Sequence, residues 1–114
     1  MTYLDVSRIA SWHAHVYFDA ASRDAAWEFS NVVTAQFGNR IAMGRFHERA
    51  VGPHPRWSYQ IAFAPTEFSD VVGWLALNHG ALDVFVIAGH DGFKQGEAQV
   101  KFAGPISESL EIFG

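Results

Sequence analysis

The chain has 114 residues, of which 49% are hydrophobic and 18% are charged, and its formal net charge at pH 7 is -4. This composition predicts a single folded domain over residues 1–114 and excludes a largely disordered chain. The absence of cysteine excludes disulfides and zinc–thiolate sites, and the acidic balance without a basic run argues against nucleic acid as a partner. Without a signal-peptide pattern or an apolar run long enough for a membrane span, we expect a cytoplasmic protein with no membrane contact.

The first clear element is the segment Trp12-His13-Ala14-His15-Val16-Tyr17-Phe18. Side chains alternate between the two faces of a strand, so His13, His15 and Tyr17 share one face and the four apolar residues share the other. A half-buried strand needs only ordinary polar residues on its outer face. Two imidazoles and a phenol there indicate a function, although partly exposed residues that a sheet merely tolerates are the simpler alternative.

Residues 23–37 follow with helical spacing. Ser22 is placed as the N-cap and Gly38 as the residue that ends the helix. The stripe that repeats every three or four positions, and should face a core, consists of Ala26, Phe29, Val33 and Phe37.

Residues 40–47 and 57–63 alternate as two further strands, which we expect to pair antiparallel. In the first of them Ile41, Met43, Arg45 and His47 are predicted on one face and Ala42, Gly44 and Phe46 on the other. The loop between the strands contains His54, which Pro53 and Pro55 hold on a restricted backbone.

A second helix is predicted to begin near Pro65 and to end at Asn78-His79-Gly80, with His79 in a structural role at its C-terminus. Short strands at residues 82–87 and 97–102 complete the chain. This order predicts an α+β fold, a ferredoxin-like βαββαβ sandwich with an extra C-terminal strand or arm and both helices on one face of an antiparallel sheet. Because the aromatic and aliphatic residues of strand 57–63 cannot all face water, a second subunit is expected to cover them, which makes a homodimer the expected assembly.

The candidate chemical groups are His13 and His15 with His54. Residues i and i+2 of a strand lie about 6.6 to 7 Å apart, close enough for both imidazoles to converge on one ion. Two histidines and a carboxylate are typical of non-haem Fe(II) sites, and the spacing does not choose among the candidate carboxylates Asp19, Glu48, Asp91 and Glu97. The same three histidines could instead act as acid–base groups without a metal.

Three stretches resemble the DOPA 4,5-dioxygenase family in order and separation. They are residues 12–18, Gly52-Pro53-His54-Pro55 with Trp57-Ser58-Tyr59-Gln60 after it, and residues 73–80. The resemblance runs from about residue 10 to residue 86. It implies the ferredoxin-like fold, a dimer, and extradiol cleavage of a catechol such as DOPA by O2 at Fe(II) or another divalent metal, giving a muconic semialdehyde.

The resemblance also implies roles for single residues. His13, His15 and His54 match histidines of the family's motifs and would be its metal or acid–base residues. Tyr17 and Trp57 would be substrate-binding residues, because a catechol ring stacks well on aromatic walls.

The sequence departs from the family's pattern near its C-terminal end. Family members usually carry histidines where this chain has Ile87 and Gln99. Either His90 replaces a lost metal ligand, or the chain is a divergent member that binds an aromatic ligand without oxidising it or that uses metal-free acid–base catalysis.

Overall fold

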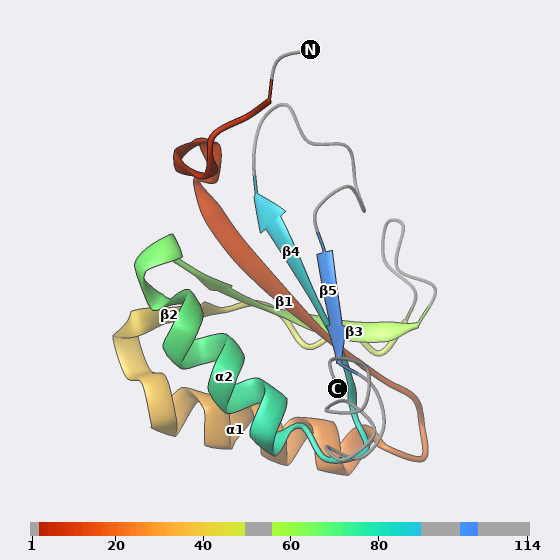
Figure 1. The fold of residues 1–114 in the computed structure, drawn as a ribbon. Helices are drawn as coiled ribbons and strands as arrows, with labels where there is room; N and C mark the ends of the chain where they lie inside the picture. The colour runs from red at the N-terminus through yellow and green to blue at the C-terminus, as the bar shows by residue number, and fades with distance from the viewer. Residues whose placement is uncertain (1–2, 50–55, 90–98, 103–114) are drawn as a thin grey trace.

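The computed structural model describes residues 3–49, 56–89 and 99–102, which form one five-stranded sheet and two α-helices (Figure 1). His54 and His90, and the candidate carboxylates Asp91 and Glu97, lie outside the described residues. Short 3-10 turns lie at Val6–Arg8, Gly38–Arg40 and Pro65–Glu67. The main elements are β1 (Ser11–Phe18), α1 (Arg23–Phe37), β2 (Ile41–Met43), β3 (Trp57–Phe63), α2 (Phe68–Asn78), β4 (Asp83–Gly89) and β5 (Gln99–Phe102).

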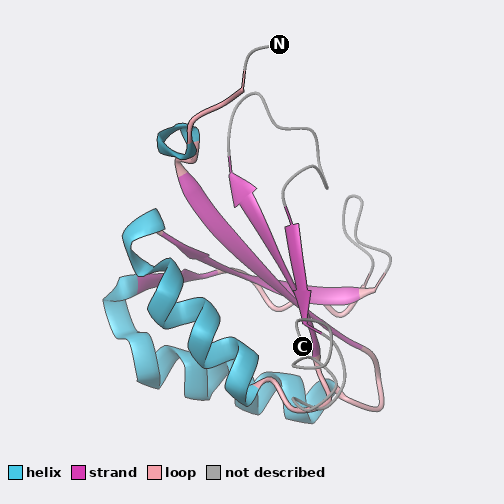
Figure 2. Cartoon of the chain, in the orientation of Figure 1, coloured by secondary structure: helices cyan, strands magenta, loops and turns pink. Residues whose placement is uncertain are grey.

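The strand order confirms the predicted ferredoxin-like topology. The strands run β2-β3-β1-β4-β5, and every neighbouring pair is antiparallel, including the predicted pairing of β2 with β3. β5 is the extra C-terminal strand and pairs with β4. Figure 2 shows α1 and α2 on the same face of this sheet, as the order of elements predicts. None of the helices within the described residues is long and apolar enough to span a membrane.

The core lies between the sheet and the two helices. All four residues of the stripe predicted on α1 are buried there. Gly38 ends the helix with φ at +55°, and its N–H donates to the carbonyl of Thr34. Ser22 does precede α1, but its hydroxyl bonds to Asp19 and not to a helical N–H, so the predicted side-chain cap is absent.

The expectation that a second subunit covers β3 was built on the wrong face of the sheet. Tyr59, Ile61 and Phe63 are at most 4% exposed and belong to the core beneath the helices, and Trp57 packs against the same core. The Tyr59 hydroxyl even donates a hydrogen bond to the carbonyl of Ala26 in α1. The chain buries this surface by itself, so these residues no longer support a dimer.

The centre of β3 provides a test of this core. Ile61→Ala should lower the free energy of unfolding by about 2 to 5 kcal/mol, because Ile61 is fully buried and its loss leaves a cavity. Val32→Ala on α1, where Val32 is 45% exposed, is the control and should change stability by less than about 1 kcal/mol. Urea unfolding followed by tryptophan fluorescence measures both. Equal losses in the two variants would contradict this placement of the core.

Candidate functional site

The predicted alternation of β1 is confirmed, and it creates two chemically different faces. Ala14, Val16 and Phe18 are fully buried in the core beneath the helices. The alternate residues of β1 therefore lie on the opposite face of the sheet, which we call the histidine face. The ladder partners of His13, His15 and Tyr17 share that face, and they are Ser58, Gln60 and Ala62 of β3 and Asp83, Phe85 and Ile87 of β4.

The two imidazoles of β1 lie next to each other but do not converge. Their ring centroids are 6.3 Å apart, the rings are nearly perpendicular at 84°, and the Nε2 atom of His13 contacts the Ser11 hydroxyl at 3.3 Å. Two histidines on one ion with metal–nitrogen bonds of about 2.1 Å have ring centres at most about 6.4 Å apart, and less in tetrahedral or octahedral geometry. The pair would have to turn its rings inward to bind one ion.

A complete metal site does not lie within the described residues, where no three histidine or carboxylate side chains are grouped around one point. The described residues therefore fit a bound metal only in part, because they contain just two of the predicted ligands, His13 and His15. A third ligand from His54 or His90, as the sequence predicts, would come from outside the described residues.

Two of the four candidate carboxylates are described, and both are engaged elsewhere. Asp19 accepts hydrogen bonds from the backbone N–H and the hydroxyl of Ser22, which lower the pKa of its carboxyl group. Glu48 accepts a hydrogen bond from the Arg23 guanidinium at 2.6 Å. Neither is placed beside the histidines of β1.

A third imidazole reaches the histidine face through an irregularity next to β2. Met43 pairs with Ile61, and His47 pairs with Ser58 through two backbone hydrogen bonds of 2.9 and 3.0 Å. Between these pairs the β2 side has three residues and β3 has two, so the chain carries a β-bulge of one extra residue.

The bulge corrects the faces predicted for residues 40–47. An extra residue reverses the alternation beyond it, because successive side chains point to opposite faces. Ile41 and Met43 pack on the core, and so does Phe46, which stacks on Phe18 at 4.4 Å. His47 is therefore on the face opposite to Met43, contrary to the prediction, and β2 itself ends at Met43.

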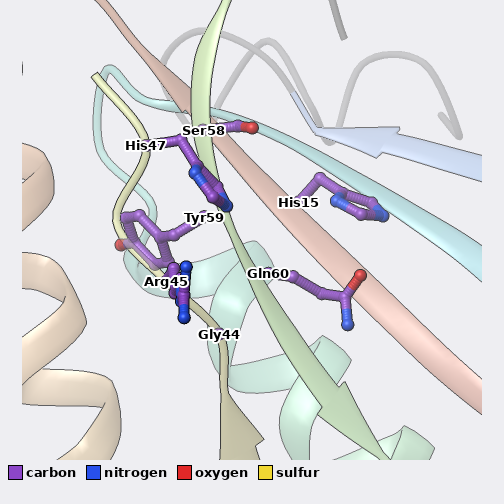
Figure 3. A pocket seen from close by; sticks show the side chains of 7 residues that line it. All are labelled: His15, Gly44, Arg45, His47, Ser58, Tyr59 and Gln60. Atoms are coloured by element: carbon purple, nitrogen blue, oxygen red, sulfur yellow. The ribbon is translucent and has the colours of Figure 1, made fainter. Parts of the chain in front are cut away.

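His15 and His47 line a common pocket of 260 Å³ (Figure 3). His15 is 8% exposed, and it pairs with Gln60 across the ladder. In Figure 3 the His15 and Gln60 side chains lie on the same side of β3. The remaining lining residues are Gly44, Arg45, Ser58 and Tyr59.

Arg45 gives the pocket a positive charge, and none of its lining residues within the described part of the chain is a carboxylate. Beside it, burial lowers the pKa of His13 below its ordinary value of 6.5, which keeps that ring neutral at pH 7. A neutral imidazole is the form that binds a metal or accepts a proton.

The two residues predicted to bind substrate lie on different faces. Tyr17 is on the histidine face, where its ring meets Phe85 edge-on at 5.7 Å and the Arg56 guanidinium lies 6.0 Å away. Trp57 pairs with Phe18, and the two rings contact each other on the core face. The structure therefore brings Tyr17, but not Trp57, together with His13 and His15.

Of the two positions where the chain departs from the resemblance, one lies beside His13 and the other lies one strand further away. Ile87 pairs with His13 across β1 and β4, and Gln99 pairs with Ile87 across β4 and β5. These residues are distant in the sequence but form one row across the sheet. The buried His79, by contrast, is remote from this face and holds the Leu82 carbonyl through Nδ1 at 2.8 Å, in agreement with its predicted structural role.

Sequence reasoning did not select His47, although one signal was available. A glycine inside a strand pattern often marks a bulge or a close backbone approach. Gly44 is such a residue, because its N–H donates to the Gln60 carbonyl at 2.7 Å and a Cβ there would lie 3.2 Å from that oxygen. Gly44 therefore indicated a possible bulge, and a bulge means that simple alternation does not predict the face of His47.

The lowered pKa of His13 predicts a loss of stability in acid. Below pH 6.5 the unfolded chain takes up a proton at His13 more readily than the folded chain, so protonation favours unfolding as the pH falls. His13→Asn should remove this contribution. Unfolding free energies measured between pH 7.5 and pH 5.5 should therefore fall less in the variant than in the unmodified protein, and parallel pH profiles would refute the assignment to His13.

Known proteins resemble this chain in sequence. A family model described as the Dopa 4,5-dioxygenase family matches residues 12–104. The DOPA 4,5-dioxygenase of Amanita muscaria is 37% identical over 92 residues, which cover 75% of this chain and 40% of that protein. The chain thus spans less than half the length of this curated relative.

A solved structure shows the same fold. A crystal structure described as a "putative dioxygenase" from Nostoc punctiforme PCC 73102 matches with a TM-score of 0.78 and 35% identity, over 98% of this chain and 100% of that one. Because the family model covers most of the sequence, the chain belongs to the DOPA 4,5-dioxygenase family.

Proposed function

We propose that this protein opens the ring of a catechol by extradiol cleavage, with O2 as the second substrate and a non-haem Fe(II) ion, or another divalent metal, as cofactor. The observation that carries the proposal is the pair of imidazoles on one face of β1 beside a concave pocket. The name of the Amanita muscaria relative makes DOPA the first substrate to test, with 4,5-cleavage to a muconic semialdehyde as the reaction.

The size of the pocket favours a small substrate. Ligand pockets usually measure about 300 to 1,000 Å³. At 260 Å³, this pocket is just below that range and suits one aromatic ring with a short substituent. Ser58 and Gln60 supply hydrogen-bonding groups along one wall.

The histidines of β1 are the metal ligands in this proposal. His15 lines the pocket, and burial favours the neutral, metal-binding form of His13. The metal, when bound by His13 and His15 with His54 or His90, supplies activation of O2 and binding of the catechol oxygens. Both oxygen atoms enter the product, so the reaction needs no added reductant.

One observation favours a second candidate, a catechol-binding module without ring cleavage. The ladder position beside His13 is occupied by Ile87, whose aliphatic side chain cannot bind a metal, and Gln99 follows in the next strand. Without a metal-binding side chain at these two positions, the protein would keep the pocket but would not bind a metal.

A catechol panel with DOPA, assayed with and without added Fe(II), tests the proposal. Oxygen uptake and near-ultraviolet product absorbance should both depend on the metal. His15→Ala should lower the turnover rate by about hundredfold or more, because it removes a predicted metal ligand. Asn31→Ala, on the exposed side of α1, is the control and should leave turnover unchanged.

Three other outcomes separate the alternatives. Turnover that survives a chelator would replace the metal mechanism with acid–base catalysis by the same histidines. Catechol binding without oxygen uptake in iron-loaded protein would select the binding module. Unchanged turnover in both His13→Ala and His15→Ala would overturn the assignment of the site.

A further inference from the structure

Arg45 is a cation in the wall of the pocket. Three other arginines are held in ion pairs, Arg23 with Glu48, Arg40 with Glu67 and Asp70, and Arg56 with Asp83. Arg45 has no ion-pair partner among the described residues, and it lines the pocket with His15 and His47. Its charge is therefore available to a molecule in the pocket.

The charge of Arg45 is not cancelled by its surroundings within the pocket. No carboxylate of the described residues lines the pocket, and Glu48, three residues along the chain, is bonded to Arg23 at 2.6 Å. The whole chain is acidic, with a net charge of -4, so this local excess of positive charge runs against the average. Such a site attracts anions.

The backbone on either side of Arg45 is hydrogen-bonded to β3. On one side the Gly44 N–H donates to the Gln60 carbonyl at 2.7 Å, and on the other side His47 and Ser58 exchange two hydrogen bonds. Gly44 approaches Gln60 closely, since an added Cβ would lie 3.3 Å from the Gln60 Cβ and would push the two strands apart slightly. The bulge therefore places the base of the Arg45 side chain beside the pocket.

We propose that Arg45 binds a carboxylate on the substrate, so that this pocket selects catechols whose side chain ends in a carboxylate. The planar guanidinium matches a carboxylate with two parallel hydrogen bonds. A pocket of 260 Å³ holds a ring and a short acidic side chain. The catechol part of this inference rests on the proposed function, whereas the carboxylate part rests on Arg45 alone.

A matched pair of ligands tests the inference, namely dihydrocaffeate and its uncharged methyl ester. Arg45→Gln should raise the Kd for dihydrocaffeate about tenfold or more, because a charge-assisted hydrogen bond is lost, and should leave binding of the ester unchanged. Arg49→Gln is the control, since it removes the same charge from an exposed residue outside the pocket lining, and it should change neither Kd by more than about twofold.

Binding is measured by NMR titration of metal-free protein, so the result does not depend on turnover. If dihydrocaffeate binds through Arg45 but no catechol is cleaved with Fe(II), the proposed function fails and the carboxylate site stands. If Arg45→Gln weakens both ligands equally, or weakens neither, the carboxylate site is overturned whether or not cleavage occurs. An equal loss in Arg49→Gln would also overturn it, because the effect would then be one of net charge.

Discussion

The register of β1 is the constraint on which the site depends. β1 is the middle strand of the sheet and is paired along nearly its whole length with β3 on one edge and β4 on the other. A slip of one residue would place His13 and His15 in the core and expose Val16. The cost of burying two imidazoles without partners while exposing an aliphatic side chain fixes the register. The same apolar face that holds the helices therefore determines where the histidines point.

The faces of β1 and of α1 could be predicted because each depends on a pattern within one short segment of the sequence. The alternation of residues 12–18 and the stripe on α1 each follow from one period, and both are confirmed. The bulge could not be predicted in the same way, since it depends on how β2 meets β3 and not on either strand alone. Local alternation continued through Gly44, and it consequently assigned His47 to the same face as Met43. The error with β3 was similar, because alternation identifies an apolar face but does not say which layer covers it.

His13, Ile87 and Gln99 form one row across the sheet, although they are far apart in the sequence. Ile87 is adjacent to both His13 and Gln99, because β4 lies between β1 and β5. The two positions that depart from the resemblance therefore lie in one row with His13, although both are distant from it in the sequence. Membership of the family and the composition of its metal site are accordingly separate questions for this chain, since the fold is preserved by the core face and the chemistry depends on the histidine face.

The two sides of the pocket differ in how many backbone hydrogen bonds hold them, so they differ in how far they can move when a ligand binds. His15 and Gln60 stand on directly paired strands within a five-stranded ladder. Arg45 and His47 stand on a bulged segment that is tied to β3 only near Gly44 and at the pair His47 and Ser58. A metal on β1 would require the rings of His13 and His15 to rotate and His13 to leave the Ser11 hydroxyl. Adjustment to substrates of different length would instead fall on the bulged side, where fewer hydrogen bonds resist it. The strand that carries the predicted metal ligands is therefore the rigid part of this site, and the segment that carries Arg45 is the adaptable part.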